Sequence, residues 1–320
     1  MERQNDDPVH EVYGLTKEER AIVEVDNMTK MSYVHRKGEV LLMKQFGGDW
    51  TKTKIEILVE YAQAYLTIMR KRRKYKTLYF DGFAGSGSIV KDNKVNISVT
   101  IGAARRIVEI EHPMPFHEYY FVEKDPKTLD LLRENTKSAF PQKTIHAVCD
   151  DCNKKLLDLA NFLRNPVNGD YRTLAYVDPC GMQVEWRSIE CLRGLSIDLW
   201  ILVPTGMGVN RLLETNGNIS PSWVERLEKF LGLTADEIKA YFYRKVDTLF
   251  PEIQLVEKEK NAIERSAKLY KKRLEDVFEF VSKPFELRNS TGSPMYHLFL
   301  ASNNATAVKI ANDIVKKFNR

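Results

Sequence analysis

The chain has 320 residues, of which 43% are hydrophobic and 29% are charged, and its net charge is +5. This composition is typical of a globular protein and excludes the disordered, collagen-like and coiled-coil classes. No run approaches the ~20 apolar residues that cross a bilayer, and the polar, acidic start of the sequence shows no secretory signal. We therefore expect a cytoplasmic protein without membrane contact, whose four cysteines are reduced. The mildly basic charge permits a nucleic-acid partner but does not by itself predict one.

Residues 1–50 are mixed and polar, and we interpret them as an N-terminal extension. A helix is predicted next, because Thr53 and Glu56 form a capping box and apolar residues follow at helical spacing. This helix ends in a basic run at residues 70–74. The run could bind phosphate, but cations are also favoured at a helix C-terminus, where they interact with the macrodipole, and we prefer this second interpretation.

Five short apolar runs alternate with helical segments from residue 77 onward. Runs without polar alternation are typical of strands buried on both faces of a parallel sheet. Asp125 and Pro126 mark one of the helix starts, with an N-cap and a proline at the first helical position. The pattern predicts a doubly wound, Rossmann-like α/β sheet within residues 51–320. The five runs are residues 77–80, 119–122, 144–148, 173–177 and 199–203.

The last third of the chain departs from this alternation. Residues from about 212 to 272 are predicted to form a helical insertion in the sheet domain. Strands return at 277–281 and 296–301, separated by a turn rich in Asn, Ser, Gly and Pro. Two strands joined in this way predict an antiparallel pair at one edge of the sheet.

A glycine-rich loop after the first predicted strand is the strongest local signal. Residues 78–87 read Leu-Tyr-Phe-Asp-Gly-Phe-Ala-Gly-Ser-Gly, so a buried strand ends in Asp81 and enters a loop that a ligand can approach closely. No Lys-Ser or Lys-Thr pair follows to form a P-loop, and Val90 replaces the third glycine of a dinucleotide fingerprint. A carboxylate at this position would repel a pyrophosphate, whereas it suits the ammonium group of a bound methionine moiety.

Two more acids are predicted at the ends of the next two strands. Glu123 can accept hydrogen bonds from ribose hydroxyls, and Asp151 can accept one from an adenine amino group. Three carboxylates at successive strand ends predict a pocket for S-adenosylmethionine, with an NAD-dependent oxidoreductase as the weaker alternative. The residues predicted to bind the cofactor are Asp81, Gly82, Phe83, Ala84, Gly85, Gly87, Glu123, Asp151 and Cys152.

The fourth predicted strand leads into a loop with candidate catalytic residues, Asp178, Pro179 and Gln183. Such a loop can hold a neutral amine through carbonyl and side-chain hydrogen bonds, with the nitrogen lone pair facing the methyl donor. Positioning would then supply most of the rate. Gly181 stands where a stacking ring would complete the loop, and Trp186 could replace that ring, although a tryptophan at a helix start favours core packing.

Two further groups leave alternatives open. Asn210 and Arg211 follow the fifth strand, where they either bind a carboxylate or phosphate or serve as a helix cap and a surface cation. Cys149 and Cys152 have the spacing of zinc ligands, and the other two cysteines could complete four thiolates. Small buried thiols are common at such strand ends, so we predict no metal.

Several of these segments, in the same order, resemble the three-Cys-motif partner family (TcmP) from about residue 46 to the C-terminus. The resemblance implies a Rossmann-type methyltransferase that works with a companion protein carrying a three-cysteine motif. The family often has an aromatic residue at the position of Cys180 and an alanine at that of Cys152. The matching segments are Phe46-Gly-Gly-Asp-Trp50, Tyr79-Phe-Asp-Gly-Phe-Ala-Gly85, Tyr120-Phe-Val-Glu-Lys-Asp125, Asp151-x-Asn153, Asp178-Pro-x-Gly-Met-Gln-Val-Glu-Trp186, Ile197-Asp-Leu-Trp200 and Gly208-Val-Asn-Arg-Leu-Leu213.

The sequence therefore predicts a methyltransferase that uses S-adenosylmethionine and acts on a nitrogen or oxygen of a nucleic acid or protein. Asp178 would orient the acceptor. The main alternative is a catalytically silent subunit that uses the same fold as a docking platform for its partner.

Overall fold

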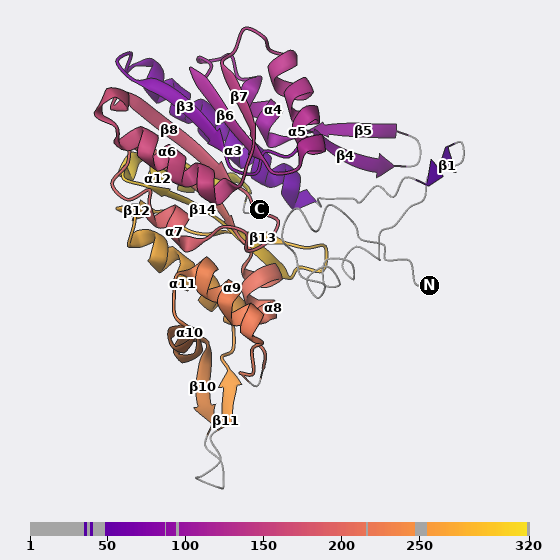
Figure 1. Cartoon of the computed structure of the whole chain (residues 1–320), viewed down its shortest axis with the longest axis vertical. Helices are drawn as coiled ribbons and strands as arrows, with labels where there is room; N and C mark the ends of the chain where they lie inside the picture. Colours follow the sequence, from indigo (N-terminus) through magenta and orange to yellow (C-terminus); the bar gives the residue numbers. More distant parts are fainter. Residues whose placement is uncertain are drawn as a thin grey trace.

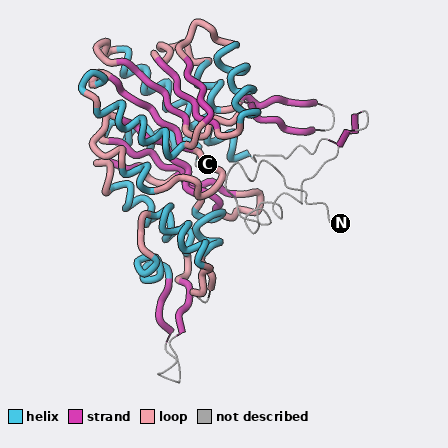
Figure 2. The backbone as a smooth tube through the Cα atoms, viewed as in Figure 1, coloured by secondary structure: helices cyan, strands magenta, loops and turns pink. Residues whose placement is uncertain are grey.

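The computed structural model places a central eight-stranded sheet between layers of helices (Figure 1, Figure 2). The structure describes residues 35–36, 39–40, 49–86, 88–93, 96–215, 217–246 and 255–318. Most of the predicted N-terminal extension and the predicted cofactor residue Gly87 lie outside the described residues. Within the extension, β1 (His35–Arg36) and β2 (Glu39–Val40) pair antiparallel.

Five parallel strands form the part of the sheet that the sequence predicts to be doubly wound. Their spatial order, β7-β6-β3-β8-β9, is the 3-2-1-4-5 order of a doubly wound sheet, so the predicted fold class is confirmed. The strand order reverses between β3 and β8, which makes the carboxyl ends of these two strands the expected place for a ligand. The five strands are β3 (Lys76–Asp81), β6 (Glu118–Glu123), β7 (Ile145–Cys149), β8 (Tyr171–Val177) and β9 (Ile197–Val203).

Antiparallel strands complete the sheet beyond β9, as the sequence predicts. β14 (Pro294–Ser302) runs antiparallel to β9, and both β12 (Phe280–Val281) and β13 (Phe285–Arg288) pair with β14. The strand that the turn joins to β14 is β13, rather than the predicted segment 277–281. Pro284 lies between β12 and β13, and because proline has no N–H to donate to the ladder, the chain forms two short strands here.

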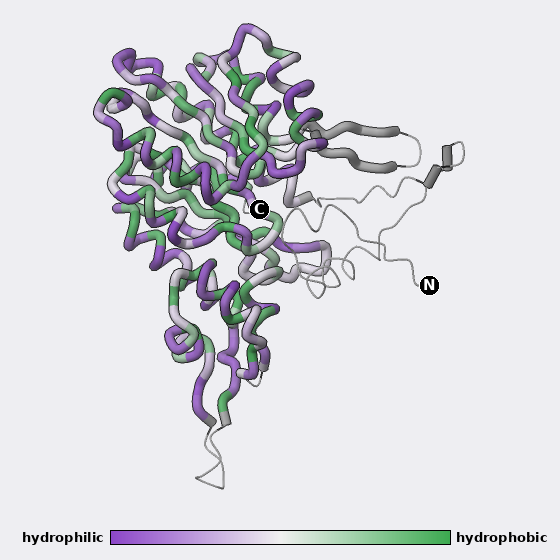
Figure 3. Tube along the Cα trace, viewed as in Figure 1, coloured by the Kyte–Doolittle hydropathy of each residue, from purple (hydrophilic) through white to green (hydrophobic). Residues whose placement is uncertain are grey.

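Each central strand alternates between two apolar cores, one on either face of the sheet. Tyr79 and Tyr176 belong to one core, whereas Phe80 and Val177 belong to the other. Successive side chains of a strand point to opposite faces, so burial on both faces requires the uninterrupted apolar runs seen in the sequence. Figure 3 shows hydrophobic residues concentrated along these strands.

Helices cover both faces, which we call the α3 face and the α6 face. The core on the α3 face includes α3 (Asp49–Arg70), α4 (Ala103–Val108), α5 (Pro126–Arg133) and α12 (Ala305–Phe318). The core on the α6 face includes α6 (Cys152–Arg164), α7 (Trp186–Glu190), α9 (Pro221–Leu231), α10 (Ala235–Phe242) and α11 (Ala262–Glu275). The short helical segments are η1 (Glu134–Ser138), η2 (Pro166–Asn168), η3 (Thr205–Val209) and α8 (Asn210–Leu212).

The predicted insertion at about 212–272 is mostly helical, because it contains α9, α10 and most of α11. It also contains an antiparallel hairpin, β10 (Tyr243–Val246) and β11 (Leu255–Lys258), which the sequence did not predict. Figure 1 shows this hairpin extending away from the central sheet. A second unpredicted hairpin, β4 (Ser88–Asn93) and β5 (Asn96–Ile101), lies in the sequence between the glycine loop and α4.

One predicted helix start is correct and another is wrong. Asp125 caps α5 by accepting a hydrogen bond from the backbone N–H of Thr128 at 2.8 Å. In contrast, Thr53 and Glu56 do not cap α3, which begins four residues earlier at Asp49, and the Glu56 carboxylate instead binds the Arg106 guanidinium through both oxygens. None of the helices in the described ranges combines the length and the apolar composition that crossing a bilayer needs.

Candidate functional site

The predicted acids lie at the carboxyl edge of the sheet, on both sides of the point where the strand order reverses. Asp81 and Glu123 are the last residues of β3 and β6, and Asp178 follows the last residue of β8. Asp151 follows β7 and is the N-cap of α6, where its carboxylate accepts the backbone N–H of Asn153 at 2.9 Å. The doubly wound topology therefore brings the four side chains to the same edge.

Backbone hydrogen bonds fix the glycine loop against the two strands that flank β3. The N–H of Gly82 donates to the Tyr176 carbonyl of β8 at 2.9 Å, and the N–H of Ala84 donates to the Val122 carbonyl of β6 at 3.0 Å. Gly85 then turns the chain with φ at +61°, in the left-handed region that favours glycine. The loop is consequently a fixed extension of the sheet edge.

Glu123 holds the same loop through its side chain. Its carboxylate accepts the backbone N–H of Gly85 at 3.0 Å through one oxygen and that of Asp125 at 2.9 Å through the other. The side chain is buried, yet it also contributes to the wall of a pocket at this edge. Each carboxylate oxygen can accept more than one hydrogen bond, so Glu123 can hold the loop and still accept from a ligand.

The pocket beside Glu123 has a volume of about 190 Å³. Five of the nine predicted cofactor residues belong to its wall, and so does the candidate catalytic residue Gln183. The lining residues are Gly82, Phe83, Val122, Glu123, Lys124, Asp150, Asp151, Cys152, Asn153, Met182, Gln183, Glu185 and Arg226.

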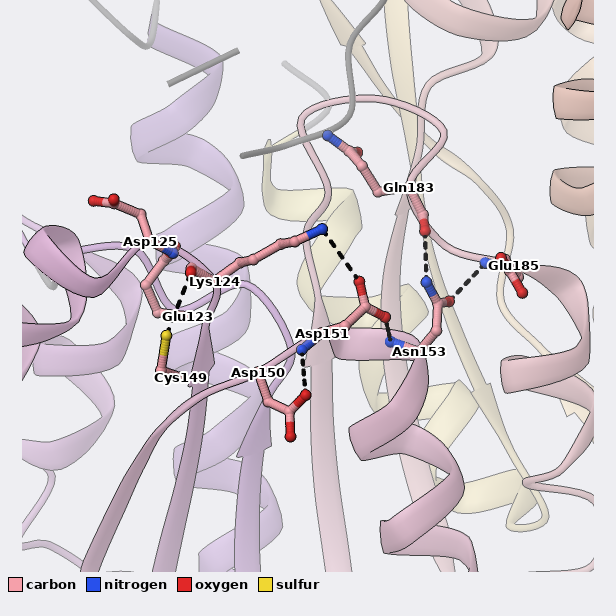
Figure 4. Close-up of polar contacts among 9 residues, drawn as sticks. All are labelled: Glu123, Lys124, Asp125, Cys149, Asp150, Asp151, Asn153, Gln183 and Glu185. Carbon is pink, nitrogen blue, oxygen red and sulfur yellow. Dashed lines mark hydrogen bonds and ion pairs between the residues drawn. The ribbon is translucent and has the colours of Figure 1, made fainter. Parts of the chain in front are cut away.

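Asn153 joins two walls of this pocket, and sequence analysis did not single it out as a site residue. Its amide nitrogen donates to the Gln183 carbonyl at 2.8 Å, and its amide oxygen accepts the backbone N–H of Glu185 at 2.8 Å (Figure 4). The Asp151 carboxylate lies between Asn153 and the Lys124 ammonium, which is 3.8 Å away. We call these two hydrogen bonds of the Asn153 side chain the Asn153 clamp, and the Asp-x-Asn motif after β7 was the sequence signal available for it.

Asp81 lies apart from the pocket lining and is 1% exposed. Its carboxylate accepts the backbone N–H of Phe83 at 3.1 Å and the Tyr79 hydroxyl at 3.3 Å. Burial raises the pKa of Asp81 to about 7, and the nearby Asp178 and Glu123 carboxylates add to this increase against the opposing effect of the hydrogen bonds. A positive charge placed beside Asp81 would favour its ionised form.

Asp178 lies on the α3 face and has a cationic partner that the sequence did not reveal. The Lys54 ammonium of α3 lies 2.5 Å from its carboxylate, and the Tyr176 hydroxyl donates to the same oxygen at 2.9 Å. Lys54 also lies over the Trp50 ring, 4.9 Å from its centroid. Lys54 is thus part of the candidate acceptor site, although it is separated from Asp178 by 124 positions in the sequence.

The other candidate catalytic residues stabilise the loop that follows β8. Pro179 is buried. The Gln183 side chain folds back so that its amide oxygen accepts the backbone N–H of Gly181 at 2.7 Å. Among the described residues, the Gln183 amide nitrogen is buried without a hydrogen-bond partner.

Trp186 and the basic run do not belong to this site. Trp186 is buried, an added Cβ on Gly232 would lie 2.2 Å from its ring, and the Arg273 guanidinium lies 4.4 Å from its ring centroid, so it serves core packing. Residues 70–74 are exposed where α3 ends and the chain enters β3, at the amino edge of the sheet. In this run the Lys74 ammonium lies over the Tyr75 ring.

The cysteines are free thiols, and they differ in exposure. Cys149 and Cys180 are exposed, whereas Cys152 is buried below the glycine loop. An added Cβ on Gly82 would lie 2.5 Å from the Cys152 sulfur, so the sulfur leaves no room for a side chain at position 82. The described ranges contain no cluster of three or more His, Cys, Asp or Glu side chains placed to hold a metal ion.

The residues at this edge fit part of a nucleoside with a cationic tail. Glu123 and Asp151 offer acceptors for hydroxyl and amino donors, and Asp81 favours a nearby positive charge. Ligand sites typically measure about 300–1,000 Å³. The pocket, at about 190 Å³, lies below this range.

No protein-family model and no curated protein matches the chain, so the resemblance to the three-Cys-motif partner family stays a prediction. Among solved structures, the chain is similar to the LPL1258 protein from Legionella pneumophila, with 12% identity, a TM-score of 0.44, and coverage of 85% of this chain and 94% of that one. It is also similar to Trm1 from Pyrococcus horikoshii in complex with S-adenosyl-L-methionine, with 11% identity and a TM-score of 0.42.

The second match covers 87% of this chain but 63% of Trm1, so the chain spans less than two thirds of that protein. Because both identities are near 11% and both TM-scores are below 0.5, neither likeness bears on activity. The strand order of the sheet shows the fold class.

Proposed function

We propose that the chain is an S-adenosylmethionine-dependent methyltransferase that acts on a nucleic acid or protein acceptor together with a protein partner. The observation that carries this proposal is the gathering of Asp81, Glu123, Asp151 and Asp178 at one sheet edge, around a loop fixed by the left-handed turn at Gly85. Carboxylates at the ends of these strands suit hydroxyl, amino and cationic groups, whereas they would repel the phosphates of a dinucleotide.

We propose that the nucleoside and the methionine end of the cofactor bind at different places along the carboxyl edge of the sheet. In our proposal, Glu123 and Asp151 bind the ribose and adenine in the pocket on the α6 face. The glycine loop carries the rest of the molecule toward Asp81, whose buried carboxylate favours the methionine end. The bound cofactor supplies a methyl group on a sulfonium, and Asp178 orients the acceptor beside it.

The alternative is a silent subunit that uses the fold to dock a partner. Asp81 favours the enzyme, because its buried carboxylate has a raised pKa and a ligand that supplies positive charge would favour its ionised form. The partner proposal rests on the family resemblance alone.

Calorimetry with S-adenosylmethionine and S-adenosylhomocysteine tests the enzyme proposal. We expect both compounds to bind. Asp81→Asn should lower the affinity for S-adenosylmethionine about tenfold to a hundredfold, since charged hydrogen bonds contribute about 1.5–3 kcal/mol. Asp198→Asn is the matched control, because Asp198 is also an aspartate of a central strand but contacts Tyr61 and Ser302 instead of the glycine loop. If neither compound binds the wild-type chain, the enzyme proposal is wrong.

A further inference from the structure

Lys54 lies in a site with the chemistry of an ammonium receptor. Its ammonium contacts the Asp178 carboxylate at 2.5 Å and lies 4.9 Å from the centre of the Trp50 ring. Proteins that bind ammonium ligands combine an aromatic face with carboxylate groups in this way. The Lys54 residue is 8% exposed, so the ion pair is largely removed from water.

Neighbouring residues hold this receptor in place without using the lysine. The Tyr176 hydroxyl donates to the Asp178 oxygen that faces Lys54, at 2.9 Å. The Trp50 ring lies 5.3 Å from the Tyr296 ring, and the Tyr296 hydroxyl donates to the Cys180 carbonyl in the Asp178 loop at 3.3 Å. The Asp178 carboxylate and the Trp50 ring are therefore held by contacts that do not involve Lys54, although Trp50 and Lys54 both belong to the first turns of α3.

Stability alone explains such a pair poorly. Removing two charges from water costs about as much as their attraction returns, so a buried ion pair is weak evidence for a structural role. This pair also lies beside Asp178, at the carboxyl edge where the strand order reverses and where we place the methyl donor.

We propose that Lys54 occupies the place of the acceptor, and that the site receives the side-chain amine of a lysine from another protein once Lys54 swings away from Asp178. The incoming ammonium would pass a proton to the Asp178 carboxylate, and the neutral amine would then take the methyl group of the sulfonium, which would leave as a thioether. This inference rests on the proposed function and narrows it from nucleic acid or protein to a protein lysine. Lys54 itself shows that the site accepts a lysine, because its ammonium already lies at the Asp178 carboxylate. The exocyclic amines of nucleobases are neutral and planar and would leave the charge of Asp178 unpaired.

The test refills the site from solution. Lys54→Ala removes three methylenes and the ammonium, which are the atoms of n-propylammonium. We expect n-propylammonium chloride to raise the melting midpoint of Lys54→Ala by about 2 °C or more over sodium chloride at equal ionic strength. The wild-type chain and Lys54→Met, whose side chain still fills the space, should not respond, and Asp178→Asn added to Lys54→Ala should abolish the response.

An equal response in Lys54→Ala and Lys54→Met, or a response that survives Asp178→Asn, overturns the inference. If Lys54→Ala does not fold in sodium chloride, refolding in n-propylammonium supports the inference, and failure in both salts overturns it. Calorimetry with S-adenosylmethionine separates this result from the proposed function. If n-propylammonium stabilises Lys54→Ala but the chain does not bind S-adenosylmethionine, the ammonium site is supported and the proposed methyl transfer is wrong.

Discussion

Gly85 donates its backbone N–H to the Glu123 carboxylate at 3.0 Å, so the turn of the glycine loop is fixed to the end of the neighbouring strand. The left-handed conformation of Gly85 directs this N–H, and the burial of Glu123 protects the bond from water. A loop residue and a strand residue 38 positions apart thus form one wall of the pocket.

Glu123→Gln should destabilise the fold. Both carboxylate oxygens accept backbone N–H groups, from Gly85 and Asp125, and an amide presents an N–H₂ donor to one of them. A buried donor facing a donor costs about 1–3 kcal/mol, so the urea midpoint should fall accordingly. Glu134→Gln, at an exposed position, is the control. An unchanged midpoint in Glu123→Gln would show that the loop is not held in this way.

Gly82→Ala should destabilise the fold because the added methyl group would clash with the Cys152 sulfur, and Cys152→Ala should relieve this clash. The added Cβ would lie 2.5 Å from the Cys152 sulfur, while its next neighbours are 3.6 Å away. Cys152→Ala deletes that sulfur, so the double variant should recover stability, with a coupling energy of about 0.5–3 kcal/mol in a double-mutant cycle. Additive effects would mean that the loop and α6 move apart to admit the methyl group.

The strand acids and the glycine loop were predictable because they depend on short-range patterns. An apolar run followed by an acid places Asp81, Glu123 and Asp178 at one edge once the topology is known. Lys54 was not predictable, since α3 precedes the sheet and no local pattern shows that its first turns reach the end of β8. The sequence also could not show that Asp81 lies outside the pocket lining, because this depends on which face of the sheet its side chain occupies.

Asn153→Ala should weaken the binding of S-adenosylmethionine without unfolding the chain. The side chain joins α6 to the loop after β8 through one donated and one accepted hydrogen bond, and both would be lost. Each such bond contributes about 0.5–1.5 kcal/mol, which predicts a loss of affinity of about tenfold. Asn161→Ala, later in the same helix and outside the pocket lining, is the control. Equal affinities in the two variants would exclude a role for the clamp.

The pH dependence of stability should report the buried Asp81. Its pKa is about 7 in the folded chain against an ordinary value of 3.8, so the folded chain retains a proton that the unfolded chain has lost. The free energy of unfolding should therefore decrease as pH rises between these two values, by at most about 1.4 kcal/mol per pH unit, and this contribution should level off at higher pH. Urea titrations at pH 5, 6 and 7 should show a shallower decrease in Asp81→Asn than in the wild-type chain. Parallel curves would contradict the raised pKa.

Binding of S-adenosylmethionine should release protons at pH 7, because the ligand brings positive charge to the edge where Asp81, with its pKa raised to about 7, is partly protonated. A cation beside the carboxylate favours its ionised form and so lowers its pKa, which predicts the release of a fraction of a proton. Calorimetry in phosphate and in Tris measures this directly, since the two buffers absorb the released proton with different enthalpies. The binding enthalpy should differ between the buffers for the wild-type chain and coincide for Asp81→Asn. A buffer-dependent enthalpy that persists in Asp81→Asn would assign the proton to another group and remove Asp81 from the neighbourhood of the ligand's charge.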